Sequence, residues 1–108
     1  MALELDPASA TRAFGDGYFN LIRRGADGSL KLSADHWRVD AEKSTPTALV
    51  FTAQEQDAPD LEVPLEQVER ITWDRLPKQQ QRSQIRFYMI GGDLWTFSGT
   101  VDEAALPS

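Results

Sequence analysis

Hydrophobic and polar residues alternate with a period of two along much of this chain. Leu30 and Leu32 alternate with polar neighbours, and Trp37 and Val39 do the same a few residues later. A two-residue period puts one side of an extended strand in the core and the other in water. The Ser, Ala and Asp at residues 33–35 favour a turn, so this stretch is predicted to form a β-hairpin with one apolar and one wet face.

The same alternation predicts further short strands, separated by turn-forming residues. These strands are expected at residues 18–22, 47–52, 61–65, 69–75, 85–89 and 94–97. Pro64 places the third of them at a sheet edge or a strand end, because proline cannot donate a hydrogen bond to a neighbouring strand. Gly91, Gly92 and Asp93 are typical of a hairpin turn between the last two strands.

A short helix is predicted before the first strand. Asp6 is a suitable helix N-cap, and Pro7 fits the first helical turn, where its missing N–H costs nothing. The Gly15-Asp16-Gly17 segment ends this helix and opens the first strand. Residues 101–106 could form barely one turn of helix before Pro107.

About seven short strands with turns between them are the pattern of a small barrel or an orthogonal β-sandwich. The expected fold class is therefore mainly β, with one short N-terminal helix. The predicted core consists of apolar positions that share the alternation, namely Phe19, Leu21, Leu30, Leu32, Trp37, Val39, Leu49, Phe51, Val63, Ile71, Trp73, Ile85, Phe87 and Phe97. Strand edges in such a fold can accept an additional strand from a partner.

The composition is that of one globular domain. The chain has 108 residues, of which 41% are hydrophobic and 26% charged, and this length leaves room for a single core. Cysteine is absent, which excludes disulfides, a thiolate nucleophile and a cysteine-based zinc site. No apolar run is long enough for a transmembrane helix, and residues 1–14 lack the features of a signal peptide. We expect the protein to stay inside the cell.

The charge is acidic overall but unevenly distributed. The formal net charge is −6, which opposes binding to nucleic acid over a broad face. Between Arg70 and Arg86 there are nevertheless five basic residues against one acid, Asp74. This window is either a solvated loop or a small cationic site for an acidic partner segment.

No arrangement of residues typical of an active site is found. His36 is the only histidine, and Asp35 beside it points to the opposite face of a strand. One histidine and scattered acids form no metal-ligand cluster, and the glycines fit turns better than a phosphate-binding loop. The sequence therefore predicts neither enzyme activity nor a cofactor.

The tryptophans and the basic window supply candidates for partner binding. Tryptophan and arginine are the residue types that anchor interfaces. The candidate residues are Trp73, Arg75, Lys78, Arg82 and Trp95. The alternative is that the tryptophans belong to the core and that the basic residues merely solvate a loop.

The order of these motifs resembles a pleckstrin-homology-like barrel, and most closely the N-terminal domain of the small subunit of FACT, the structure-specific recognition protein family of histone chaperones. The residues that carry the resemblance are Tyr18-Phe19-Asn20, Gly28-Ser29-Leu30-Lys31-Leu32-Ser33, Trp37-Arg38-Val39, Leu65-Glu66-Gln67-Val68, Trp73-Asp74-Arg75, Ile85-Arg86-Phe87 and Gly92-Asp93-Leu94-Trp95-Thr96-Phe97-Ser98-Gly99. They span roughly residues 14–100. His36 stands where the family usually has glycine.

The resemblance implies a non-enzymatic, nuclear module that pairs with the pleckstrin-like middle domain of the large FACT subunit. The complex would reach histones and nucleosomes during transcription, replication and repair, while this domain alone would bind little DNA and no membrane. The alternative is a stand-alone, cytoplasmic module of the GRAM or bacterial pleckstrin-like type that binds a lipid headgroup or a small ligand. In that reading Arg23 and Arg24 of the first hairpin loop are the cationic residues, with Asp27 opposing them.

Three segments are expected. Residues 1–14 form an extension with the short helix, residues 15–100 form the barrel, and residues 101–108 form a tail. The resemblance implies a long C-terminal helix that plugs the barrel, and this tail is too short to provide it. Either the sequence is a piece of a longer one, or the end of the barrel is closed in another way.

Overall fold

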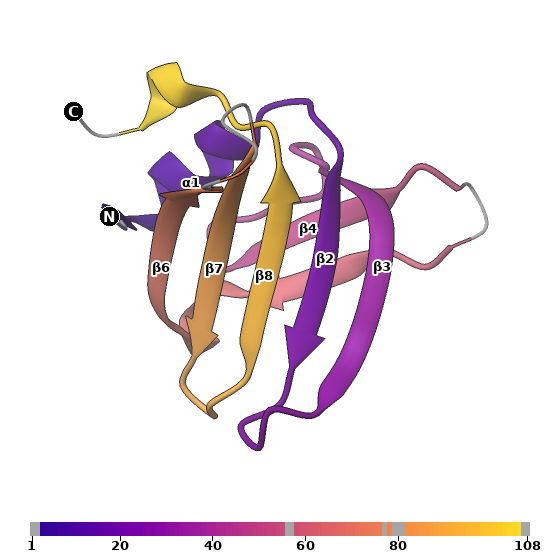
Figure 1. Cartoon of the computed structure of the whole chain (residues 1–108). Coiled ribbons are helices and arrows are strands. Elements are labelled where there is room, and N and C mark those ends of the chain that lie inside the picture. Colours follow the sequence, from indigo (N-terminus) through magenta and orange to yellow (C-terminus); the bar gives the residue numbers. More distant parts are fainter. Residues whose placement is uncertain (1–2, 56–57, 77, 79–81, 107–108) are drawn as a thin grey trace.

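A computed structural model describes residues 3–55, 58–76, 78 and 82–106. The strands form one antiparallel sheet that curls into a half-barrel (Figure 1). In chain order, the elements are β1 (Leu3–Leu5), α1 (Pro7–Phe14), β2 (Phe19–Arg24), β3 (Leu30–Val39), β4 (Ala48–Ala53), β5 (Leu61–Pro64), η1 (Leu65–Gln67), β6 (Val68–Arg75), β7 (Ser83–Met89), β8 (Leu94–Gly99) and η2 (Glu103–Ala105). The predicted loop at 77–83 lies largely outside the described residues.

The order of the strands across the sheet is β1-β6-β7-β8-β2-β3-β4-β5. Strands β2 to β5 pair in sequence order, and so do β6 to β8, but β5 and β6 are not neighbours in the sheet. The two sets of strands join where β2 lies beside β8 (Figure 1). A four-strand and a three-strand meander joined by their first and last strands, within one curled antiparallel sheet, are consistent with a pleckstrin-homology-like barrel. The prediction of a mainly β fold with a short N-terminal helix is confirmed, and Pro64 ends an edge strand as expected.

Helix α1 forms where the sequence predicts it. Asp6 is extended at the N-cap position, Pro7 occupies the first turn, and Gly15 at φ +57° ends the helix. The buried residues Ala10, Ala13 and Phe14 are three and four positions apart, so they share one face. No helix in the described part of the chain is long and apolar enough to cross a membrane.

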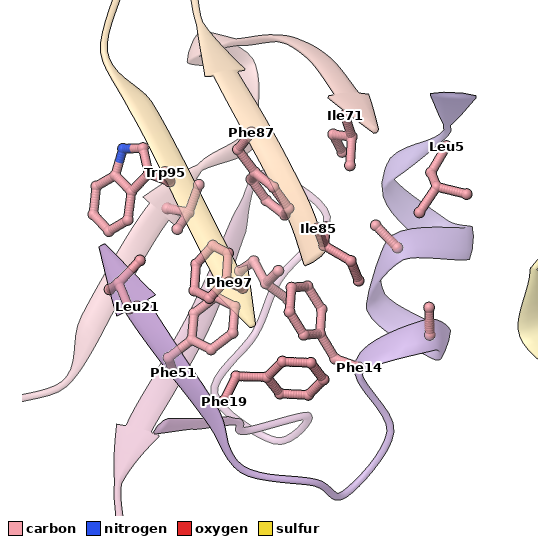
Figure 2. Packing of buried hydrophobic residues seen from close by; sticks show 14 of the residues in the cluster. Leu5, Phe14, Phe19, Leu21, Phe51, Ile71, Ile85, Phe87, Trp95 and Phe97 are labelled. Carbon is pink, nitrogen blue, oxygen red and sulfur yellow. The ribbon is translucent and has the colours of Figure 1, made fainter. Parts of the chain in front are cut away.

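Phe14 anchors α1 in the core. Its ring meets those of Phe19, Phe51 and Phe97 nearly edge-on, at centroid distances of 4.9, 5.2 and 5.2 Å. Figure 2 shows these rings gathered between the helix and the strands. Because Phe19, Phe51 and Phe97 come from β2, β4 and β8, one residue of α1 joins distant parts of the sheet. The helix that packs inside this curled sheet therefore comes from the N-terminal side of the barrel.

Most of the predicted core is buried. The confirmed positions are Phe19, Leu21, Trp37, Leu49, Phe51, Val63, Ile71, Ile85, Phe87 and Phe97. Leu32, Val39 and Trp73 are only partly buried and pack against the core. The prediction for Leu30 is wrong, because this side chain is 57% exposed.

The exposure of Leu30 follows from a β-bulge. The pairing of β2 with β3 shifts between Arg23, which faces Leu32, and Arg24, which faces Leu30. One extra residue in β3 is taken up at this point, and a shift of one residue turns a side chain to the opposite face of the sheet. Leu30 therefore lies on the outer face beside Arg24, while Leu32 keeps the inward orientation.

The predicted turn at residues 33–35 is also wrong, because β3 runs without reversal from Leu30 to Val39. A second pairing irregularity lies here: Leu21 faces Ala34, whereas Phe19 faces Trp37. His36 has φ +64° at the same place. A bulge changes the phase of the hydrophobic alternation just as a turn does, and for this reason the pattern resembled a hairpin.

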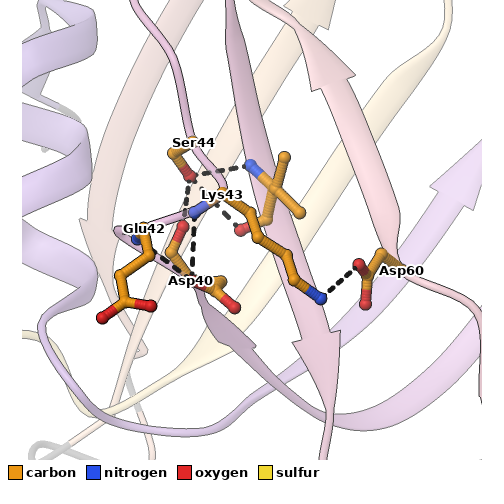
Figure 3. A network of polar contacts seen from close by, with 6 residues as sticks. Asp40, Glu42, Lys43, Ser44 and Asp60 are labelled. Carbon is orange, nitrogen blue, oxygen red and sulfur yellow. Dashed lines mark hydrogen bonds and ion pairs between the residues drawn. The ribbon is translucent and has the colours of Figure 1, made fainter.

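Polar contacts fix the connection between β3 and β4 (Figure 3). Asp40 accepts a hydrogen bond from the Lys43 amide at 3.1 Å, and the Ser44 hydroxyl accepts one from the Val50 amide at 3.0 Å. Lys43 Nζ lies 2.9 Å from an oxygen of Asp60, and this contact raises the pKa of Lys43. The connection is thereby tied to the loop that precedes β5.

Candidate partner-binding faces

Trp73 and Arg75 lie near the end of β6 that approaches η2. The Arg75 guanidinium lies 5.8 Å from the centroid of the Trp73 ring and forms an ion pair with Glu103. Trp73 is half-buried, and its indole nitrogen is buried without a hydrogen-bond partner within the described residues. Arg75 and Ser83 line an open depression of about 500 Å³ together with residues 100–104.

Lys78 and Arg82 belong to the connection between β6 and β7. Lys78 is exposed. Arg82 is half-buried, and its guanidinium donates to the Ser98 carbonyl at 3.4 Å. Arg75 pairs with Ser83 across the two strands, so the neighbouring Arg82 lies on the opposite face. The structure therefore does not gather Arg75 and Arg82 on one surface.

Trp95 lies apart from the other candidates, inside the half-barrel. It is only 6% exposed and stacks on Phe97 at a centroid distance of 6.4 Å. The Arg23 guanidinium lies over its ring at 4.8 Å. This geometry makes Trp95 a core residue whose open side is covered by an arginine.

Asp93 holds Arg23 in that position. Arg23 donates to one oxygen of Asp93 from Nε at 3.0 Å and from Nη2 at 2.7 Å, and Lys31 Nζ lies 3.7 Å from the other oxygen. The hydrogen bond from Arg23, with help from Lys31, lowers the pKa of Asp93. The two basic residues are therefore neutralised in part by one carboxylate.

A surface that the sequence analysis did not identify lies on the outer side of the sheet. Across the strands, Arg70 pairs with Tyr88, Tyr88 with Leu94, Leu94 with Arg24, and Arg24 with Leu30. Residues that face one another in antiparallel strands project to the same side, so these five side chains form one row. The Arg70 guanidinium lies 5.5 Å from the centroid of the Tyr88 ring, in agreement with this arrangement.

Strand β7 adds two further arginines to this side. Its buried residues are Ser83, Ile85, Phe87 and Met89. The alternate positions of β7, which include Arg86, therefore point outward. Arg82 directly precedes the buried Ser83 and donates to the Ser98 carbonyl, which places it on the same outer side. We call Arg24, Arg70, Arg82, Arg86 and Tyr88 the outer arginine face. Figure 1 looks onto it: β6, β7, β8, β2 and β3 lie in front, and α1 and β4 lie behind them.

The guanidinium groups of this face bind mainly uncharged acceptors. Arg24 donates to the Gly28 carbonyl at 3.2 Å, and Arg86 donates to the side-chain oxygen of Gln84 at 2.8 Å. Arg70 forms an ion pair with Glu4. Within the part of the chain that the structure describes, Arg24, Arg82 and Arg86 have no ion pair.

The basic window from Arg70 to Arg86 is thus divided between two sides of the sheet. The alternation of buried and polar residues along β7 could have placed Arg82 and Arg86 on one face. Arg24 could not have been added from sequence, because it joins the face only through the pairing of β2 with β8.

Comparison with protein-family models, with curated proteins and with solved structures gives no match for this chain. Among residues 3–55, 58–76, 78 and 82–106, no group of three or more His, Asp or Glu side chains could hold a metal ion.

Proposed function

We propose that this chain is a non-enzymatic protein-interaction module, and that it pairs with a second pleckstrin-like domain in the manner of the small FACT subunit. Its expected partner is the middle domain of the large FACT subunit, and its place of action is the nucleus. Histones and nucleosomes would be reached through the complex and not by this domain alone.

The observation that carries the proposal is the strand order. The meanders β2 to β5 and β6 to β8, joined where β2 lies beside β8, are consistent with the pleckstrin-homology-like barrel that the resemblance implies. A second observation supports it at one residue. His36 occupies the position of the family's usual glycine and has φ +64°, a conformation that glycine adopts without steric cost. The positive φ of residue 36 is thus a conformation that favours the glycine found at this position in the family.

The outer arginine face favours a protein partner. An open sheet surface with arginines around a tyrosine has the residue types that are enriched in interfaces. In the alternative reading, a lipid headgroup would have to compete with Asp93 for Arg23, and the acidic chain would approach an anionic membrane against electrostatic repulsion. We therefore place the lipid-binding reading second.

The test is an affinity measurement between this chain and the isolated middle domain of the large FACT subunit. We expect a saturable complex. Arg75→Glu and Lys78→Glu test whether the basic candidates predicted from sequence take part in it. Absence of a complex with the unmutated chain contradicts the proposal, and sedimentation of the chain with phosphoinositide-containing liposomes would support the alternative. A complex that neither charge reversal weakens keeps the proposal but moves the interface away from Arg75 and Lys78.

A further inference from the structure

We propose that the outer arginine face binds an acidic segment of a partner protein in extended conformation. This inference rests on the proposed function in that it assumes a protein partner, and it names the surface and the chemistry of that partner.

The charges of the face are available for such a segment. The guanidinium groups of Arg24, Arg82 and Arg86 hydrogen-bond neutral oxygens and form no ion pair with a carboxylate of the described residues. A guanidinium can present two parallel N–H donors to a carboxylate, which gives stronger and more directional binding than a lysine ammonium does. The net negative charge of this chain repels an acidic segment. The arginines of the outer arginine face attract it.

The spacing of the arginines fits an extended chain. Arg86 lies on β7 and Arg82 directly precedes its first residue. Four residues of extended chain correspond to about 13 Å at the rise of a strand. Residues i and i+4 of an extended segment are separated by the same distance. Carboxylates at these two positions would therefore meet Arg82 and Arg86 when the segment runs along β7.

Apolar contacts continue the site beyond Arg86. Tyr88 follows two residues later on the same side of β7, and Leu94 of β8 faces it. Leu30 and Ile22, on the adjoining β3 and β2, are 57% and 39% exposed. A segment with acidic residues at i and i+4 would place its residue i+6 over Tyr88. An aromatic or aliphatic residue at i+6 is the expected third contact.

A nucleic acid fits this face less well than a short peptide does. A duplex carries one negative charge for about every 1.7 Å of its length, so its phosphates would extend past the four arginines. The face is bordered by Glu4 and contains Asp74, which faces Gln84, and the chain has a formal charge of −6. The four arginines can attract a few carboxylates, whereas the negative charges around them and the net charge of the chain repel a continuous polyanion.

The experiment uses a fluorescent 12-residue peptide with glutamate at positions 3 and 7, phenylalanine at position 9, and serine or threonine elsewhere. Binding to the full chain is followed by fluorescence anisotropy. We expect saturation below about 1 mM, at least tenfold weaker binding to Arg82→Glu/Arg86→Glu, and weaker binding as salt rises. The control variant Arg12→Glu/Lys43→Glu has the same change in charge away from the outer arginine face, and should bind within twofold of the unmutated chain.

Folding of each variant is checked by circular dichroism, and the milder Arg82→Gln/Arg86→Gln replaces the charge reversal if that variant does not fold. The inference is overturned if the peptide does not bind, if a peptide with glutamine in place of glutamate binds equally well, or if both double variants lose affinity alike. It is also overturned if a 12-nucleotide oligothymidylate competes more strongly than the peptide. A complex with the FACT middle domain in the absence of peptide binding would overturn this inference alone and leave the proposed function intact.

Discussion

His36 has a backbone conformation that differs from that of the other residues of its strand. It lies within β3, where regular strand residues have negative φ, yet its φ is +64°. A residue with a Cβ pays roughly 1–2 kcal/mol for this conformation relative to the right-handed one. The pairing shift between Leu21 and Phe19 imposes the conformation, because β3 must absorb an extra residue there.

We expect His36→Gly to be more stable than His36→Ala by about 1 kcal/mol, because both variants lose the imidazole but only glycine avoids the steric cost of positive φ. Urea unfolding measures the difference. Arg38, two residues further along β3, is the control position, since its φ is not positive. There the order should reverse, with alanine more stable than glycine. The same order at both positions would contradict the assigned backbone conformation.

Asp93 is the residue with the clearest electrostatic role. Its side chain receives two hydrogen bonds from Arg23 and lies near Lys31. These contacts lower the pKa of Asp93 below its ordinary value near 4. The group therefore stabilises the fold at pH values above the pKa of the unfolded chain, and this stabilisation is lost as pH falls through the lowered pKa of the folded state.

We expect Asp93→Asn to be less stable than the unmutated chain at pH 7, and the difference in free energy of unfolding to shrink as the pH falls below about 4. Urea unfolding from pH 7 to pH 3 gives the comparison. Glu62→Gln removes the same charge from an exposed position of β5 and serves as the control. A difference for Asp93→Asn that stays constant over this range would exclude a role for its charge.

At the scale of elements, the short helix α1 contributes buried side chains to the core of the half-barrel. It has eight residues, too few to be stable as an isolated helix in water. Its stability depends on packing, in which Phe14 contacts rings on β2, β4 and β8 and Ala10 and Ala13 are also buried. The helix and the half-barrel therefore stabilise each other.

Phe14→Ala should lower the free energy of unfolding by about 3–5 kcal/mol, since it removes a fully buried ring and leaves a cavity. Thermal and urea unfolding measure the loss. Phe14→Leu, with an expected loss of about 1–2 kcal/mol, keeps the test usable if the alanine variant does not fold. The control is Arg12→Ala on the exposed side of α1, which should change stability by less than about 0.5 kcal/mol. Equal effects of Phe14→Ala and Arg12→Ala would show that α1 is not packed as described.

The whole molecule combines an acidic net charge with one cationic surface. Arg24, Arg70, Arg82 and Arg86 face outward on neighbouring strands, whereas the chain as a whole carries a formal charge of −6. Such a distribution orients an acidic partner during approach, and the effect weakens with added salt.

Direct binding of duplex DNA by this domain should be weak. The net charge opposes the phosphate backbone, and the few outward arginines can contact only a short length of it. We expect a Kd weaker than about 1 μM at physiological salt in an electrophoretic or anisotropy assay. A tighter complex with a steep dependence on salt would contradict this expectation and would direct attention to the outer arginine face as a nucleic-acid site.

The sequence by itself determined the elements whose signals are local. The two-residue period located the strands, Pro7 and Gly15 bounded α1, and the glycines at 91 and 92 marked the last turn. Local patterns work here because side-chain alternation and backbone preferences act over a few neighbouring residues. The mainly β fold and ten buried positions of the predicted core follow from them.

Three features are decided only by the tertiary structure: the outward orientation of Leu30, the continuity of β3, and which residues form the outer arginine face. The bulges that turn Leu30 outward and keep β3 unbroken arise from pairing with β2. Arg24 meets the row of Arg70 because β2 lies beside β8. Each of these features depends on which residue of a distant strand lies opposite, and the period of a single strand does not contain that information.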